Sequence, residues 1–138
     1  MKKCIVLLAL LLAVLSGCQQ KKEPETVIEN NGMIEIREDM PVKVTYHRMW
    51  IYGLDKESTD PELIMQLLKQ IRDIKLGEST NMGVMDYTDI IIFEYEDGEK
   101  RSYKFEADIY VKQEKERYVV TDGLQYLRAT LDYMVEQK

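Results

Sequence analysis

Cysteine and histidine are scarce in this 138-residue chain, which has two cysteines and one histidine. Both cysteines, Cys4 and Cys18, lie within the first eighteen residues, so the chain after Cys18 contains no thiol. Disulfides, thiolate nucleophiles and cysteine metal sites are therefore excluded from that part. Zinc usually takes several nitrogen or sulfur ligands, and His47 supplies one. A small domain without disulfides must be held together by its apolar core.

Basic residues are in the minority, with 19 Lys and Arg against 25 Asp and Glu and a formal charge of −6. Residues 1–17 hold two of the lysines and no acid, so residues 18–138 carry 17 basic and 25 acidic residues, a formal charge of −8. An acidic surface repels nucleic acid and anionic lipid headgroups. We therefore expect no nucleic-acid partner.

Long apolar runs are absent except at Ile5–Leu15, which has eleven residues. A permanent membrane-spanning helix needs about 20 residues, and the following chain is polar. Lys2 and Lys3 precede the run and small residues follow it, which is the pattern of an export signal.

The residues that follow, Leu15-Ser16-Gly17-Cys18, resemble the lipobox of bacterial lipoproteins position for position. The resemblance covers residues 1–18 only. It implies that Cys18 receives a diacylglyceryl group, that residues 1–17 are removed as a signal peptide, and that the protein is anchored outside the cytoplasmic membrane, or at an outer membrane if the cell has one. Two acyl chains are enough for stable anchoring. The alternative is an ordinary secretory signal with an unrelated cysteine.

Residues 18–32 are polar, with Pro24 and an Asn30-Asn31-Gly32 turn signal, and we interpret them as a flexible tether. Residues 33–138 are then one domain. Period-two alternation predicts strands over 33–38 and 41–52, and Arg48 interrupts the apolar side of the second.

A first helix is predicted from a Thr59–Glu62 capping box to a C-terminal Gly77. Residues 77–86 are then expected to be a loop. The remaining predicted elements are a strand at 89–96, a hairpin turn at Asp97-Gly98, a return strand over 103–111, a charged turn at 113–117, a strand at 118–120 and a helix at 124–135 begun by an Asp122–Gln125 capping box.

The predicted order is β-β-α-β-β-β-α. Short connections favour an antiparallel sheet, and two amphipathic helices imply one covered face. The predicted fold class is therefore α+β, a two-layer sandwich with a sheet of about four to five strands.

The candidates for catalysis are few. His47 shares the polar side of its predicted strand with Lys43 and Thr45, which favours a solvated or hydrogen-bonded role. The serines at 58, 79 and 102 lack the context of an activated nucleophile, although a Ser79–His47 pair stays open. Acid pairs at Glu38-Asp39 and at Asp86 with Asp89 have the chemistry for acid–base work. We assign no catalytic residue.

Two loops resemble ligand-binding loops only in part. Residues 55–62 alternate oxygen donors somewhat as a calcium loop does, but without its glycine and its terminal glutamate. Residues 77–83 contain glycine, serine and threonine without the Gly-Lys-Ser/Thr of a phosphate loop. We predict no metal and no cofactor.

Tyrosine is the abundant side chain, with nine residues. Tyrosine and tryptophan bury a ring while keeping a polar tip wet, which favours interfaces. Either these rings cover the sheet as part of the core, or they form an exposed face that binds a protein, peptide or glycan. The candidate binding residues are Tyr46, Trp50, Tyr52, Tyr95 and Tyr103.

The sequence therefore favours a lipid-anchored, non-enzymatic binding or accessory domain that recognises another envelope protein through its sheet face or an edge strand. One alternative is an immunity or inhibitor lipoprotein against a toxin or hydrolase, since an acidic domain suits a basic target. The other is an envelope hydrolase that uses acidic residues and His47.

Overall fold

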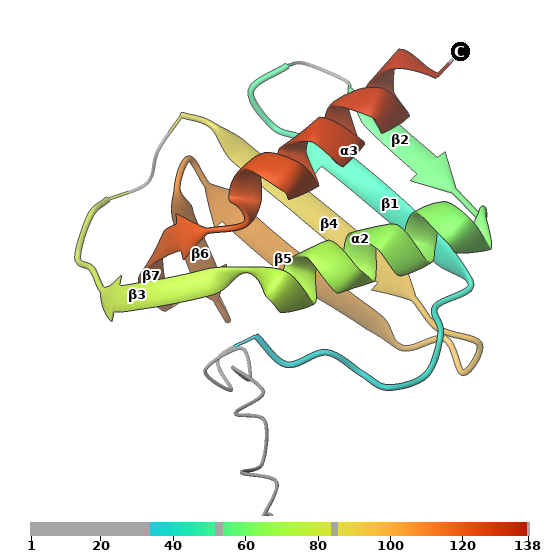
Figure 1. The fold of residues 1–138 in the computed structure, drawn as a ribbon, viewed down its shortest axis with the longest axis horizontal. Helices are drawn as coiled ribbons and strands as arrows, with labels where there is room; N and C mark the ends of the chain where they lie inside the picture. Colours follow the sequence, from blue (N-terminus) through green and yellow to red (C-terminus); the bar gives the residue numbers. More distant parts are fainter. Residues whose placement is uncertain (1–33, 52–53, 84–85, 138) are drawn as a thin grey trace, which may run out of the picture.

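The computed structural model describes residues 34–51, 54–83 and 86–137. Two helices and a seven-stranded sheet make up this part, and both helices lie on the same face of the sheet (Figure 1). In chain order the elements are β1 Lys43–Arg48, β2 Asp55–Ser58, α2 Pro61–Asp73, β3 Lys75–Ser79, β4 Thr88–Glu94, β5 Lys100–Glu106, β6 Ile109–Lys112, β7 Glu116–Asp122 and α3 Leu124–Glu136.

The sheet has the strand order β2-β1-β4-β5-β6-β7-β3, and every neighbouring pair is antiparallel. The predicted α+β class, antiparallel sheet and two helices are confirmed. The predicted number of four to five strands is wrong, because the sheet has seven. The additional strands are β2 and β3, at the two edges, and the return strand 103–111 is two strands, β5 and β6.

The covered face and the open face of the sheet follow from the alternation of side chains. On the covered face, towards the helices, Tyr46, Ile91 and Tyr103 stand opposite one another on β1, β4 and β5, and all three are buried. On the open face the neighbouring positions are Thr45, Ile92 and Ser102, of which none is buried. In the described part of the chain no helix packs on the open face.

Helix α2 starts one residue later than predicted. Asp60 is the N-cap and its carboxylate accepts a hydrogen bond from the backbone of Glu62 at 3.0 Å, while Pro61 occupies the first turn, where its missing N–H costs nothing. The buried stripe is Ile64, Leu67, Leu68 and Ile71. Asp60 can cap the helix in place of Thr59 because a carboxylate, like a hydroxyl, accepts hydrogen bonds from the N–H groups of the first turn.

The predicted end of this helix at Gly77 is wrong. The helix ends at Asp73, and Ile74 is already extended and leads directly into β3. Gly77 lies within β3, where an added Cβ would come within 2.9 Å of Thr121 Cγ2. The glycine therefore allows β3 and β7 to approach each other, and the predicted loop over 77–86 begins with an edge strand.

The hairpin prediction at Asp97-Gly98 is confirmed. Gly98 has a φ of 84° and donates its N–H to Tyr95 O at 2.9 Å, which closes the turn between β4 and β5. The return strand is interrupted at Ala107, which has a φ of 50°. β6 then folds back against β5, and β7 runs from Glu116 to Asp122, longer than the predicted 118–120.

The predicted strand at 33–38 is not a strand in the described residues 34–38. Ile34 is buried and Ile36 packs against the core, and Tyr103 donates its hydroxyl hydrogen to Glu35 O at 2.8 Å. The period-two pattern therefore reflects a segment with one buried side. In the described residues no strand pairs with this segment.

Helix α3 begins at a close crossing with the end of α2. Its N-cap is Gly123, with a φ of 95°, and an added Cβ there would lie 3.1 Å from Ile74 Cα. Gln125 Nε2 still donates to Asp122 Oδ1 at 3.3 Å, so the predicted capping pair forms one residue outside the cap. No helix of the described residues is long and apolar enough to cross a bilayer.

Candidate functional site

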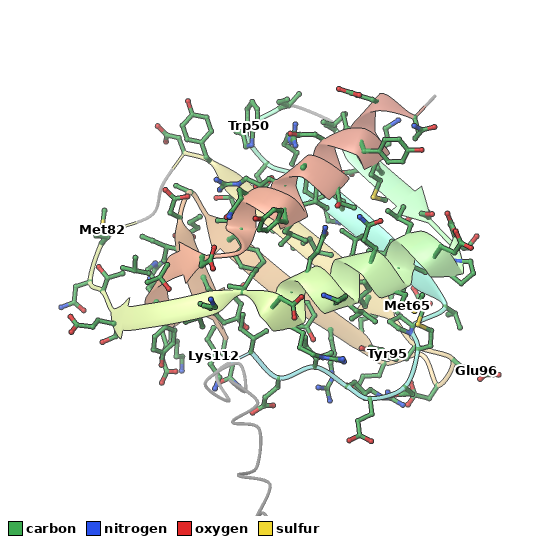
Figure 2. The ribbon with its side chains drawn as sticks, in the orientation of Figure 1. Trp50, Met65, Met82, Tyr95, Glu96 and Lys112 are labelled. Atoms are coloured by element: carbon green, nitrogen blue, oxygen red, sulfur yellow. The ribbon has the colours of Figure 1, made fainter. Side chains whose placement is uncertain are left out.

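An exposed apolar cluster lies where β1 ends and β4 begins. We call its four residues, Met49, Trp50, Ile51 and Tyr87, the loop-end patch. Their exposed fractions are 64%, 43%, 38% and 58%. The Trp50 and Tyr87 rings meet edge to face with centroids 5.5 Å apart, the favoured geometry for aromatic pairs. Trp50 lies at the upper edge in Figure 2.

Backbone hydrogen bonds tie the loop-end patch to the sheet. Met49 N donates to Thr88 O at 3.0 Å, and Arg48 N donates to Leu54 O at 3.2 Å. From the other side, Ala107 N donates to Tyr87 O at 2.7 Å. The patch is thus joined to the ends of β1, β4 and β5 by ladder-type bonds.

Arg48 connects the loop-end patch to the core. Its guanidinium lies 5.0 Å from the centroid of the Trp50 ring and 5.4 Å from that of Tyr46, and its side chain is only 11% exposed. Its Nε donates to the Tyr46 hydroxyl at 2.7 Å, and its Nη2 bonds Asp132 of α3. The arginine that interrupts the apolar pattern of β1 therefore links the sheet, the helix and Trp50.

Asp89 completes this buried network. It is 5% exposed, accepts the Tyr46 hydroxyl hydrogen at 2.5 Å and lies 3.6 Å from Arg128 Nε. Burial raises the pKa of the Tyr46 phenol, and the bond to Asp89 raises it further. The phenol therefore stays protonated as the donor. Two arginines balance two aspartates, which makes the network a fixed base for the patch.

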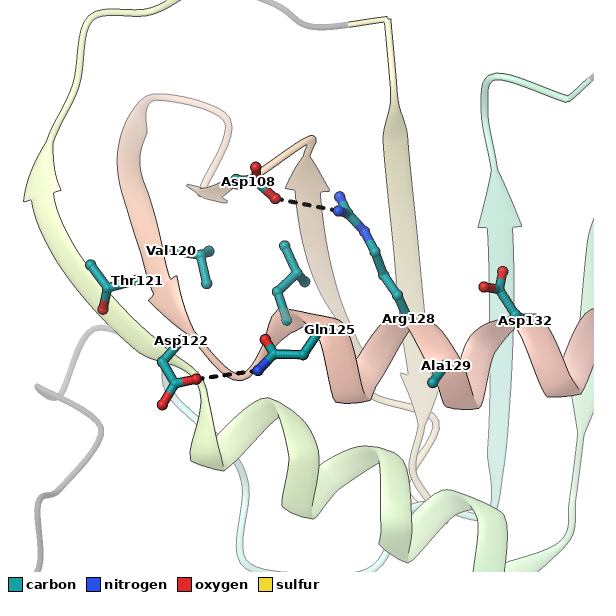
Figure 3. A pocket seen from close by; sticks show the side chains of 9 residues that line it. Asp108, Val120, Thr121, Asp122, Gln125, Arg128, Ala129 and Asp132 are labelled. Atoms are coloured by element: carbon teal, nitrogen blue, oxygen red, sulfur yellow. Dashed lines mark hydrogen bonds and ion pairs between the residues drawn. The ribbon is translucent and has the colours of Figure 1, made fainter.

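An acidic groove lies beside this network, between β7 and α3 (Figure 3). Its volume is about 520 Å³. Arg128 bonds Asp108 at 3.3 Å, and Lys75 and Gln125 bond Asp122. The lining residues are Asp108, Val120, Thr121, Asp122, Leu124, Gln125, Arg128, Ala129 and Asp132.

The predicted binding residues fall into two groups. Tyr46, Tyr95 and Tyr103 are 0%, 1% and 3% exposed and belong to the core under the helices. Trp50 is exposed in the loop-end patch. Tyr52 and the lipidation candidate Cys18 lie outside the described residues. Of the two roles open for the tyrosines, Tyr46, Tyr95 and Tyr103 therefore take the core role.

The catalytic alternatives are dispersed. His47 lies on the open face with Nδ1 2.6 Å from Asp55 Oδ1. Ser79 lies on edge strand β3, five strand positions away from β1, which corresponds to roughly 24 Å at the usual strand spacing. The structure therefore excludes the Ser79–His47 pair.

The other predicted motifs take structural roles. Residues 55–58 form β2, where Glu57 pairs with Lys43 at 2.9 Å, and Ser102 stands in the middle of β5. Asp39 binds Arg37 at 2.5 Å, and Asp89 is held as described above. Within residues 34–51, 54–83 and 86–137, no three His, Cys, Asp or Glu side chains are grouped as metal ligands.

Sequence reasoning missed Tyr87 and the buried network. Two signals pointed to the network: Arg48 interrupts an apolar strand side, and Asp89 opens a buried strand. Each charge needs a buried partner, but the partners Arg128 and Asp132 come from α3, far away in the chain.

No protein-family model, no curated protein and no solved structure matches this chain. Its function is therefore argued from its own residues.

Proposed function

We propose that this chain is a lipid-anchored, non-enzymatic accessory domain that binds another envelope protein through the loop-end patch. The observation that supports this proposal is the exposed Trp50–Tyr87 pair held on the Arg48 network. Aromatic residues, methionine and arginine are enriched in protein interfaces, and truncation of tryptophan, tyrosine or arginine usually costs the most affinity.

The position of the patch favours a protein over a membrane as its partner. The described chain starts at Ile34, at the lower edge of the molecule in Figure 1, and the loop after β1 lies at the upper edge. A lipid anchor on Cys18 attaches the domain to the membrane through the end at which Ile34 lies. The patch lies at the opposite end of the domain, where a flexible tether leaves it accessible to a protein partner.

The test of the patch is affinity capture from envelope extracts, followed by measurement of Kd with each purified captured protein. The Trp50→Ala/Tyr87→Ala variant should weaken binding at least about 30-fold, the loss of a single interface hot spot of about 2 kcal/mol. The matched control is Met65→Ala/Met82→Ala, which removes two exposed apolar side chains outside the loop-end patch. Equal affinities for both variants would count against the proposal.

The anchor is tested separately with Cys18→Ala. Labelled palmitate should be incorporated into the unchanged chain, which should partition into the detergent phase. The variant should carry no label. Equal labelling of both chains would contradict the lipobox assignment, whatever the outcome for the patch.

The acidic groove favours a second candidate, an immunity or inhibitor lipoprotein against a basic toxin or hydrolase. Three partly exposed carboxylates line it: Asp108, Asp122 and Asp132. Each of them also pairs with one cation, Arg128, Lys75 or Arg48 respectively. Charge complementarity mainly raises association rates and makes them salt-dependent. Deletion of the gene should then sensitise cells to one toxin, and Asp108→Lys/Asp122→Lys should abolish protection while Trp50→Ala leaves it intact.

A further inference from the structure

A second groove runs along the seam between α2 and α3 on the outer surface of the helical layer. We call it the tyrosine groove, and its volume is about 420 Å³. Six residues line it: Gln66 and Gln70 of α2 with Tyr126, Ala129, Thr130 and Tyr133 of α3. None of the six is charged, although 32% of the chain is. The groove is therefore suited to an uncharged ligand.

The floor of the groove is a hydrogen-bond cluster centred on the Thr130 hydroxyl. Gln66 Nε2 and Gln70 Nε2 donate to Thr130 Oγ1 at 3.2 and 2.9 Å, and Thr130 in turn donates to Tyr126 O at 3.3 Å. The hydroxyl has no capacity left. Gln70 Oε1 is buried with no hydrogen-bond partner among the described residues. If the Gln70 amide is turned by 180°, Oε1 and Nε2 exchange places, and Nε2 is then the buried atom without a partner.

The walls of the groove are two tyrosines. Tyr126 and Tyr133 are 64% and 58% exposed and stand seven residues apart on α3, about 10.5 Å along the helix axis. Ala129 lies between them with a side chain too small to fill the space. A neighbouring hollow of about 360 Å³ shares Gln66, Gln70 and Tyr126 and is also lined by Lys69 and Asp73, which pair with each other at 2.6 Å. The groove is therefore longer than a single small molecule.

We propose that the tyrosine groove binds a neutral glycan strand. Sugar hydroxyls both donate and accept, so they suit the exposed Gln66 amide as it stands, and the Gln70 amide when its side chain, which leaves one buried atom unpaired, turns into the groove. The C–H faces of the sugars pack on tyrosine rings, which offer a large rigid surface with a polar tip. A charged ligand would find no counter-charge in the six lining residues. An apolar helix would bury the polar groups of Gln66, Gln70 and Thr130 without offering them hydrogen bonds. This site is distinct from the loop-end patch and does not depend on it.

The test uses the full chain in detergent, titrated with chitotetraose, a neutral β-1,4-linked oligosaccharide, and followed by NMR and calorimetry. We expect saturable binding that perturbs Tyr126, Tyr133 and the Gln70 amide. Tyr126→Ala/Tyr133→Ala should weaken it at least 10-fold, while Tyr133→Phe should keep most of it because the ring stays. Trp50→Ala/Tyr87→Ala should bind the sugar normally.

A second variant separates binding from folding. Gln70→Leu removes the unpaired acceptor, so the Tm should be unchanged or higher while sugar binding falls at least 10-fold. No binding of chitotetraose by the folded chain would overturn the proposal, as would equal binding by the double tyrosine variant. Perturbation of the groove by an uncharged peptide of similar length but not by the sugar would also overturn it and point to a peptide site.

Discussion

The two faces of the sheet are built from alternate residues of the same strands, yet they are held by different forces. On the covered face, Val44 stands opposite Phe93 and Ile91 opposite Tyr103, and all four are buried. On the open face many interactions are charge pairs, such as Lys43 with Glu57 and Lys100 with Glu94. Burial of apolar area therefore stabilises one side, and mostly solvated pairs stabilise the other.

The open face is nevertheless buried in part around β5 and β6, at Thr88, Ile109, Val111 and, most completely, Glu106. This glutamate is 0% exposed and lies between Lys104 and Arg117, at 3.0 and 3.3 Å. Burial raises the pKa of Glu106, but the hydrogen bonds from Lys104 and Arg117 outweigh it and bring the pKa below its ordinary value. The comparison teaches that position on the open face does not by itself mean exposure.

The largest effect is expected from the covered face. Phe93→Ala removes a fully buried ring and should lower the free energy of unfolding by about 3–5 kcal/mol, because a cavity replaces its contacts. The control is the neighbouring residue on β4, Ile92, which is half-buried on the open face. Ile92→Ala should lower the free energy of unfolding by about 1 kcal/mol. Urea unfolding measures both.

If Phe93→Ala does not fold, Phe93→Leu keeps most of the volume and should still cost more than Ile92→Ala does. Equal losses for Phe93 and Ile92 would show that the two faces do not differ as the structure shows.

An intermediate effect is expected at Glu106. Glu106→Gln keeps the shape and removes the charge between two partly exposed cations, so a loss of about 1 kcal/mol is expected at pH 7. The folded pKa lies below the unfolded one, so the folded state binds fewer protons. The contribution is therefore present above the ordinary glutamate pKa and is lost as the pH falls through the folded pKa.

Urea unfolding at pH 7 and at pH 3 checks this prediction. The difference between the unchanged chain and Glu106→Gln should shrink towards the acidic end. A difference that grows on acidification would mean that the buried carboxyl is protonated in the folded state.

The smallest effect is expected at His47. Its pair with Asp55 lies on the open face with partly exposed side chains, and His47→Ala should change the free energy of unfolding by no more than about 0.5 kcal/mol. The same variant should leave partner binding and sugar binding intact. Loss of either would assign His47 a functional role and revive the hydrolase alternative.

Local signals predicted much of the fold. The Asp97-Gly98 turn, the stripe of α2 from Ile64 to Ile71 and the buried strand around Ile91 and Phe93 all lie where their patterns indicate. The two edge strands were missed because Asp55–Ser58 and Lys75–Ser79 carry few apolar side chains. Their backbones pair with a neighbour, and backbone pairing leaves no mark in side-chain periodicity.

The candidate sites were predictable only in part. Trp50 is exposed just after β1, but the same criterion selected Tyr46, Tyr95 and Tyr103, which are buried. Alternation says which residues share a face and is silent on which face the helices cover. The tyrosine groove was hidden for a related reason, since Gln70 and Thr130 meet only when α2 packs on α3.

By itself the sequence determined the elements whose signals are local, namely turns, caps and helical stripes, and it predicts an export signal with a lipobox cysteine. The tertiary structure decided which tyrosines are covered, which charges meet in the Arg48 and Glu106 networks, and where Trp50 and Tyr133 stay accessible. The reason is physical. Short-range propensities act between residues close in the chain, whereas burial and charge pairing depend on the distances that packing sets between residues far apart in it.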